Sequence, residues 1–162
     1  MQPPVDPSAV VHEQAGASVV GPANESDREM VRSLLASAGL PHADLGADSP
    51  ISLLVARDHG GIIGAIGLER YGSTGLLRSL VVRPEQRGQG LGLRLVRALE
   101  DLAHTAGISE LVLLTETADA FFARHGYRGI ARHEAPAEVQ ASEEFRSLCP
   151  ASAVCMTKSL LR

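Results

Sequence analysis

Hydrophobic residues along the chain follow two spacings, one typical of strands and one typical of helices. Short apolar runs between turns rich in Gly, Pro or Asp predict strands, whereas apolar residues at three- and four-residue steps predict amphipathic helices. Strands are predicted over 18–21, 51–57, 62–69, 76–82, 108–114, 127–132 and 153–158. Helices are predicted over 26–38, 91–106 and 118–125, with helical pieces in 136–148.

The two longer helices carry signals for their ends. The sequence S-D-R-E at Ser26–Glu29 has the spacing of a capping box. In such a box the Ser26 hydroxyl accepts from a first-turn amide, and the Glu29 side chain accepts from the Ser26 backbone amide. Gly39 and Gly107 are expected to end the two helices. The polar face of the second helix is expected to carry Arg94, Arg97, Glu100 and Asp101.

The order of these elements predicts the fold class. The series β-α-β-β-β-α-β-α-β-β describes a mixed α/β domain with helices on the faces of one sheet. A strand–helix–strand crossover over 76–114 places strands 76–82 and 108–114 parallel to each other. Residues 1–16 are rich in Pro and small residues and lack periodicity, so we expect a mobile leader followed by a single domain over 17–162.

Composition narrows the class of protein. Hydrophobic residues make up 44% of the 162 residues but aromatic residues only 3%, so the core must be built from Leu, Val, Ala and Ile. A net charge of −4 argues against a nucleic-acid binder. The chain shows no signal peptide and no apolar run near the roughly 20 residues of a membrane span, so no membrane partner is expected. A cytoplasmic enzyme is the expectation.

One loop has a composition suited to binding an anion. R-P-E-Q-R-G-Q-G-L-G, Arg83 to Gly92, joins a predicted strand to a predicted helix. At such a junction the first amides of the helix have no partner within it, and glycines let the backbone point them into one concavity. Two other phosphate motifs are excluded, because the only Lys is Lys158 and the glycine spacing is G-x-G-x-G.

The longer stretch L-V-V-R-P-E-Q-R-G-Q-G-L-G closely resembles the acyl-CoA-binding signature of the GNAT superfamily of N-acetyltransferases. The R/Q-x-x-G-x-G/A core of that signature falls on Arg87, Gly90 and Gly92. F-F-A-R-H-G-Y, Phe121 to Tyr127, resembles the short helix and strand entry of the same family. Together with G-L-E-R-Y-G, L-L-R-S-L-V-V and S-L-C-P-A-S-A-V-C-M, these motifs resemble the ArsN-type acetyltransferases linked to arsenic resistance.

The resemblance implies the GNAT fold and acetyl-CoA as co-substrate. That fold has a mixed, mostly antiparallel sheet of six to seven strands, splayed between two parallel strands and flanked by about four helices. Backbone amides of the glycine loop would hold the pyrophosphate, and the backbone of Leu80, Val81 and Val82 would pair with the pantetheine arm. The implied cofactor-binding residues are these three with Arg87, Gly88, Gln89, Gly90, Leu91, Gly92, Leu93, and more weakly Thr115 and Phe122.

The implied reaction is direct transfer of an acetyl group to a primary amine, which needs a base. Glu69, at the end of the strand before 76–82, is the first candidate, and Glu116 is the alternative. Many relatives use a Tyr as acid at the position occupied here by Phe122, which cannot donate a proton. Tyr127 stands where the family usually has a packing aromatic, so a Tyr acid is in doubt.

Arg78 is the candidate for holding the acceptor. Alternation within 76–82 puts Arg78 on the same face as Leu76 and Leu80, where a guanidinium is costly unless it has a partner. It would either bind a substrate carboxylate or pair with Glu69 on the neighbouring strand. The first reading predicts a small amino acid-like acceptor, in keeping with an ArsN-type enzyme, with Arg70 and Tyr71 lining the pocket.

Other readings stay open. Acetylation of proteins or peptides is one alternative, and an acyl-CoA sensor without catalysis is another. Cys149 and Cys155 are too few for a disulfide framework, and two thiols six residues apart are only a weak signal for a metalloid site, because free Cys is often a small buried apolar residue. The histidines show no ligand spacing, so no metal site is expected. A homodimer is expected because many members of the family are dimers.

Overall fold

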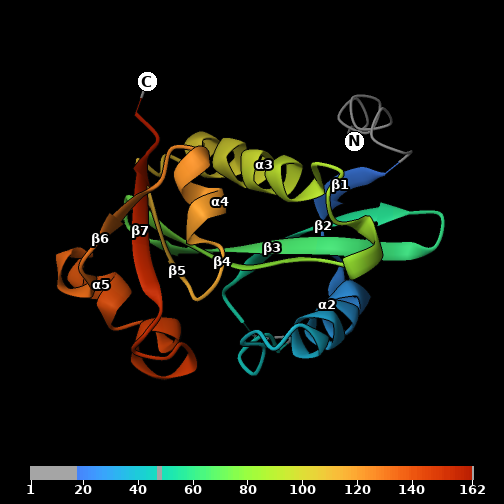
Figure 1. Cartoon of the computed structure of the whole chain (residues 1–162), viewed down its shortest axis with the longest axis horizontal. Helices are drawn as coiled ribbons and strands as arrows, with labels where there is room; N and C mark the ends of the chain where they lie inside the picture. Colours follow the sequence, from blue (N-terminus) through green and yellow to red (C-terminus); the bar gives the residue numbers. More distant parts are fainter. Residues whose placement is uncertain (1–17, 47–48, 162) are drawn as a thin grey trace. The chain divides into compact units, whose positions relative to one another are not determined.

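The computed structural model describes residues 18–46 and 49–161, and its elements follow the predicted order (Figure 1). The predicted leader lies outside these residues. The strands are β1 (Val19–Pro22), β2 (Ser52–Asp58), β3 (Gly61–Tyr71), β4 (Thr74–Val82), β5 (Glu110–Thr115), β6 (Arg128–Ile130) and β7 (Val154–Ser159). The α-helices are α2 (Glu25–Ser37), α3 (Leu91–Thr105), α4 (Asp119–Arg124) and α5 (Ala137–Gln140), with short turns of helix at η2 (Pro84–Gln86), η3 (Arg132–Glu134) and η4 (Glu144–Leu148).

The strands form one mixed sheet of seven in the order β1-β2-β3-β4-β5-β7-β6. β4 and β5 are parallel, with Thr74 opposite Glu110 and Leu76 opposite Val112. The pairs β1–β2, β5–β7 and β6–β7 are antiparallel. The predicted mixed α/β class and the parallel pair flanking the α3 crossover are therefore confirmed. Within the described ranges, no helix has both the length and the apolar character that crossing a bilayer requires.

Contacts divide the chain into two compact units. The first unit comprises the described residues up to Gly67 together with Ser79–Leu99, and the second comprises Leu68–Arg78 with the described residues from Glu100 onward. β3, β4 and α3 are continuous elements that contribute residues to both. Whether the chain forms the single domain expected over 17–162 stays a prediction.

The core of the first unit joins α2 to the strands. Val31, Leu34 and Leu35 point from α2 into a cluster with buried residues of β2, β3 and β4. The other members of that cluster lie in these strands and in the segment between α2 and β2, and they are Leu45, Ile51, Leu53, Val55, Ile62, Ala65 and Val81. Met30 falls at helical spacing with these residues in the sequence but is 47% exposed, so the buried face of α2 is narrower than the spacing of its apolar residues predicts.

The core of the second unit lies between strands β4, β5 and β7 and the polar segment that precedes β7. Leu76, Val112 and Cys155 from the three strands contact Ala135, Val139 and Phe145. The segment 136–148, predicted as helical in pieces, forms α5 and η4 and packs its few apolar residues onto this sheet. Figure 1 shows β7 between β5 and β6, as the strand order requires.

The predicted capping box of the first helix is wrong by two residues. Asn24, not Ser26, caps α2, and its side chain accepts from the Asp27 amide at 2.9 Å. The Asp27 carboxylate accepts in return from the Asn24 amide at 2.7 Å. Asp27 also accepts two hydrogen bonds from Arg57 of β2, at 2.7 and 3.1 Å. This tertiary ion pair fixes the earlier of two local patterns that both have capping-box spacing.

We expect Asp27 to make the first unit sensitive to acid. The Arg57 guanidinium, followed by the Asn24 amide, holds the pKa of Asp27 below its ordinary value against the opposing effect of burial. A depressed pKa means that the stabilisation is present above the unfolded value of about 3.9 and is lost as pH falls through the folded pKa. Asp27→Asn should therefore lower the free energy of unfolding by about 1 kcal/mol at pH 7, and by progressively less below pH 4.

Urea unfolding at pH 7, 5, 4 and 3 measures this difference. Glu25→Gln is the matched control, because Glu25 is exposed in the same helical turn and has no Arg57 contact of this kind. A difference between Asp27→Asn and the parent that stays constant from pH 7 to pH 3 would show that the ion pair does not stabilise the fold.

Candidate active site

The glycine loop is exposed and leads directly into α3. β4 ends at Val82, η2 follows, and Arg87 to Gly90 are exposed before Leu91 begins the helix. Gly88 and Gly90 have φ values of +80° and +81°, in the left-handed region that favours glycine. Two left-handed glycines with one residue between them curve the backbone so that successive amides can face one direction. These amides precede the positive end of a 15-residue helix.

Two arginines anchor the beginning of this loop. The Arg83 side chain donates through Nε to the Ile62 carbonyl at 2.6 Å, while its amide donates to the Ile63 carbonyl at 2.9 Å. Arg87 donates through Nε to the Val82 carbonyl at 3.3 Å. This role of Arg83 was not predicted from the sequence, although an Arg before a Pro at the end of a strand could have indicated it. These contacts tie the predicted phosphate loop to β3 and β4.

The end of β4 departs from regular strand geometry. Ser79 has φ of +63° and is the one non-glycine residue in the described ranges with positive φ. Because side chains alternate only in extended backbone, the expectation that Arg78 and Leu80 share a face cannot be carried across Ser79. Val81 is buried in the core, whereas Leu80 and Val82 are partly exposed.

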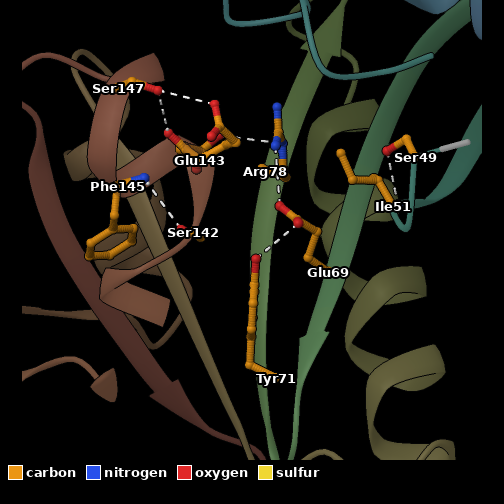
Figure 2. A network of polar contacts seen from close by, with 10 residues as sticks. Ser49, Ile51, Glu69, Tyr71, Arg78, Ser142, Glu143, Phe145 and Ser147 are labelled. Carbon is orange, nitrogen blue, oxygen red and sulfur yellow. Dashed lines mark hydrogen bonds and ion pairs between the residues drawn. The ribbon is translucent and has the colours of Figure 1, made fainter. Parts of the chain in front are cut away.

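Glu69, Tyr71 and Arg78 come together in a polar cluster (Figure 2). The Glu69 carboxylate lies between the other two side chains, accepting from the Tyr71 hydroxyl at 2.9 Å and from Arg78 Nη1 at 3.2 Å. Glu69 and Arg78 are buried, with 8% and 3% of their surface exposed. The expectation that Arg78 pairs with Glu69 is confirmed, and Arg78 as a clamp for a substrate carboxylate stays a prediction.

A second carboxylate, missed in the sequence, completes the cluster. Glu144 of η4 is buried and lies 3.4 Å through Oε1 from Arg78 Nε. Ser142, just before η4, is buried as well and has a hydrogen-bond interaction with Tyr71. Nothing in the local pattern of 136–148 marks either residue, because only their packing beside β4 gives them partners. The three named charges are two carboxylates and one guanidinium.

The Tyr71 hydroxyl is held as a hydrogen-bond donor. Burial, and then the neighbouring Glu69 carboxylate, raise the pKa of Tyr71 to about 12, and this exceeds the lowering by Ser142 and Arg78. Tyr71 is therefore protonated at neutral pH and fixes one oxygen of Glu69. The other oxygen of Glu69 is fixed by Arg78, so the orientation of this carboxylate is set by two side chains.

The other predicted site residues lie elsewhere. Arg70 is exposed and donates through Nε to the Gly72 carbonyl at 3.0 Å, on the opposite side of β3 from its neighbours Glu69 and Tyr71. Thr115 ends β5, where its hydroxyl accepts from the Ala118 amide at 2.9 Å. Phe122 is 3% exposed and packs edge-on against Phe121 and Tyr127. The cluster therefore does not include these three residues.

Tyr127 is a core residue, as the packing interpretation predicted. It is 3% exposed, and its hydroxyl donates to Glu100 Oε2 at 2.8 Å. Burial, together with Glu100, raises the pKa of Tyr127 far above its ordinary value, so the hydroxyl remains protonated. Lys158 Nζ also contacts Glu100, at 2.9 Å. Glu100, which was expected on the polar face of the second helix, is instead part of this partly buried network.

Neither Cys149 nor Cys155 forms a disulfide in the described residues, and both are held as neutral thiols. Burial, and then Glu144, raise the pKa of Cys149 to about 12, and burial raises the pKa of Cys155 to about 11. A neutral thiol is a poor nucleophile and a poor metal ligand. Over residues 18–46 and 49–161, no group of three or more His, Cys, Asp or Glu side chains is arranged to hold a metal ion.

Comparison with known proteins identifies the family of the chain. The family model described as an acetyltransferase (GNAT) domain matches residues 49–129, half of the chain. This range contains β3, β4, the glycine loop and α3. An IAA acetyltransferase from Azospirillum brasilense is 39% identical over 71 residues, covering 43% of this chain and 46% of that protein. The matched segments span less than half of the length of the curated relatives.

Solved structures share the fold at low sequence identity. N-acetylglutamate synthase from Neisseria gonorrhoeae, complexed with coenzyme A and N-acetyl-glutamate, has a TM-score of 0.73 at 20% identity, over 90% of this chain and 35% of that chain. A Mycobacterium tuberculosis protein in complex with CoA has a TM-score of 0.72 at 23% identity, over 88% of this chain and 99% of that chain. Because the acetyltransferase family model covers half of its residues, the chain belongs to the GNAT family.

Proposed function

We propose that this protein is an acetyl-CoA-dependent N-acetyltransferase that acts on the primary amine of a small amino acid-like substrate. The observation that carries the proposal is the glycine loop between β4 and α3, with left-handed Gly88 and Gly90 before the helix N-terminus. Membership of the GNAT family supports acetyl transfer. The two solved relatives described above contain coenzyme A, which supports the same carrier here.

The loop would hold the diphosphate of acetyl-CoA through main-chain amides. The amides from Gly88 to Leu93 would donate to its oxygens, and Arg87 would add a charge-assisted contact. The backbone of Leu80 to Val82 would pair with the pantetheine arm as an added strand does. An amide near Val81 or Val82 would donate to the thioester oxygen as that oxygen gains charge. Acetyl-CoA supplies the activated acyl group.

Glu69 would take the proton of the attacking amine. An alkylamine is mostly protonated at neutral pH, so it needs a base before it can form the new C–N bond. Tyr71 and Arg78 hold both oxygens of Glu69, which fixes the direction in which the carboxylate accepts a proton. As the amide forms, the C–S bond breaks and the thiolate leaves. A thiol with a pKa of about 8.5 can leave without a dedicated acid, which is compatible with Phe122 at the usual Tyr position.

The charges of the cluster support an amino acid-like acceptor. An amino acid carries an ammonium group and a carboxylate, and the cluster offers carboxylates at Glu69 and Glu144 and a guanidinium at Arg78. A planar guanidinium suits a carboxylate because it can donate two parallel hydrogen bonds. An acceptor of the ArsN type, such as an amino acid-like arsenical, has the same two groups. A homodimer stays a prediction from the family resemblance, and a cytoplasmic location stays a prediction from the composition.

A panel of amines with measured CoA release tests this function. We expect turnover with at least one free amino acid, less turnover with its carboxamide, and heat from acetyl-CoA binding in calorimetry. An amino acid-like arsenical belongs in the panel as the ArsN-type acceptor. Turnover only with peptides would replace the proposal by protein or peptide acetylation. Binding of acetyl-CoA without turnover on any amine would indicate a sensor, and the absence of binding would reject the carrier itself.

A further inference from the structure

Arg78 contacts two buried carboxylates, Glu69 and Glu144, which come from different segments of the chain. Glu69 lies on β3, beside the strand that carries Arg78, and its contact with Nη1 measures 3.2 Å. Glu144 comes from η4, a five-residue π-helical segment, and its contact with Nε is the longer one at 3.4 Å. π-Helical turns are rare and occur frequently at functional sites. The two contacts occupy different nitrogens of one guanidinium.

The geometry implies a competition at this guanidinium. An acceptor carboxylate that binds Arg78 would enter a cluster that already contains two buried carboxylates, and like charges at short range in a low-dielectric site repel strongly. Glu69 is also bound by Tyr71 and is the proposed base, so it must stay. The carboxylate that can give way is Glu144, because it belongs to a short segment outside the sheet.

We propose that Glu144 occupies the place of the acceptor carboxylate on Arg78 and is exchanged for it when the acceptor binds. This inference rests on the proposed function and names a specificity residue of the same site. An acceptor with a carboxylate compensates for the lost Glu144–Arg78 contact, whereas an amine without one does not. The apparent affinity of the protein for the acceptor then depends on the fraction of molecules in which Glu144 has left Arg78, because only those molecules can bind the acceptor carboxylate.

Glu144→Gln tests the exchange by removing the competing charge at nearly constant shape. We expect the KM for a free amino acid to fall by about 3- to 10-fold, while the KM for its carboxamide does not fall. The matched control is Glu143→Gln, which removes the same charge one residue earlier from an exposed position, where Glu143 contacts Ser147 (Figure 2). The ratio of the two KM values in this control should equal that of the parent.

An unchanged or raised KM for the amino acid in Glu144→Gln, or an equal fall for the carboxamide, would overturn the proposal. Hydrogen–deuterium exchange on the unaltered protein gives a second measurement that does not depend on how the variant folds. Amides in 144–149 should exchange faster with a saturating free amino acid than with its carboxamide. Equal exchange rates with the two ligands would reject the exchange.

These outcomes are distinguishable from a failure of the proposed function. Calorimetric titration of the common free L-amino acids into the parent and into Glu144→Gln needs no turnover. Tighter binding by the variant supports the exchange even if no acetyl group is transferred. If neither the parent nor Glu144→Gln binds an amino acid, the exchange is overturned. The proposal of acetyl transfer would still stand if CoA is released with other amines.

Discussion

Replacing Glu69 by Gln should lower kcat by about 100- to 10,000-fold, the usual contribution of a general base. The amide of Gln keeps the size of the side chain and can still accept from Tyr71 or Arg78, but it cannot take a proton from the amine. Because the glycine loop belongs to a different part of the chain, the Kd for acetyl-CoA should stay within about twofold of the parent in calorimetry. CoA release at several pH values measures the loss.

The control for Glu69→Gln is Glu143→Gln, which changes the same functional group at an exposed position. A rate for Glu69→Gln close to that of the parent across the whole pH range would remove Glu69 as the base. Glu116→Gln would then be the next variant to measure, since Glu116 follows β5 and was the alternative from the sequence.

Replacing Arg78 by Met should destabilise the protein by about 3–5 kcal/mol, as does the loss of one partner of a buried ion pair. Arg78 is 3% exposed, and its removal leaves the carboxylates of Glu69 and Glu144 buried without their shared counter-charge. The double variant Arg78→Met/Glu144→Gln should recover part of the loss, because one of the two charges is then gone. Urea unfolding monitored by circular dichroism gives the free energies.

Arg70→Met is the matched control for this measurement. Arg70 is an exposed arginine on β3, and its substitution should change the free energy of unfolding by less than about 0.5 kcal/mol. A loss of less than about 1 kcal/mol in Arg78→Met would mean that the cluster is more hydrated than its burial indicates. A double variant no more stable than Arg78→Met would show that Glu144 does not share the charge of Arg78.

Local patterns were sufficient where the cause of a structure is local. The apolar periodicity of 91–106 predicted α3, because burying one face of a helix requires that spacing. The glycine loop was found for the same reason, since positive φ at Gly88 and Gly90 is a property of single residues. The pairing of Arg78 with Glu69 was one of the two alternatives that the sequence offered for Arg78, because two strands joined by a tight turn must be neighbours.

Patterns failed where two local solutions were equally good or where the partner was distant. Ser26–Glu29 and Asn24–Asp27 both have capping-box spacing, and Arg57, 30 residues from Asp27, decides between them. Positive φ at Ser79 has no signal in a strand sequence that otherwise reads as regular. Glu144 lies 66 positions after Arg78 in a polar segment whose periodicity is weak, so its role was invisible until the fold brought the two together.

The amino-acid sequence by itself determined the order of the elements, the family and the loop that is proposed to bind acetyl-CoA. Each of these depends on backbone preferences and side-chain spacing within about 15 consecutive residues. Only the tertiary structure decided the environment of the proposed acceptor site, namely that Glu69 is fixed by Tyr71 and that Arg78 is shared with Glu144. The physical reason is that the protonation and reach of a buried charge depend on its neighbours in space, which the chain sequence does not specify.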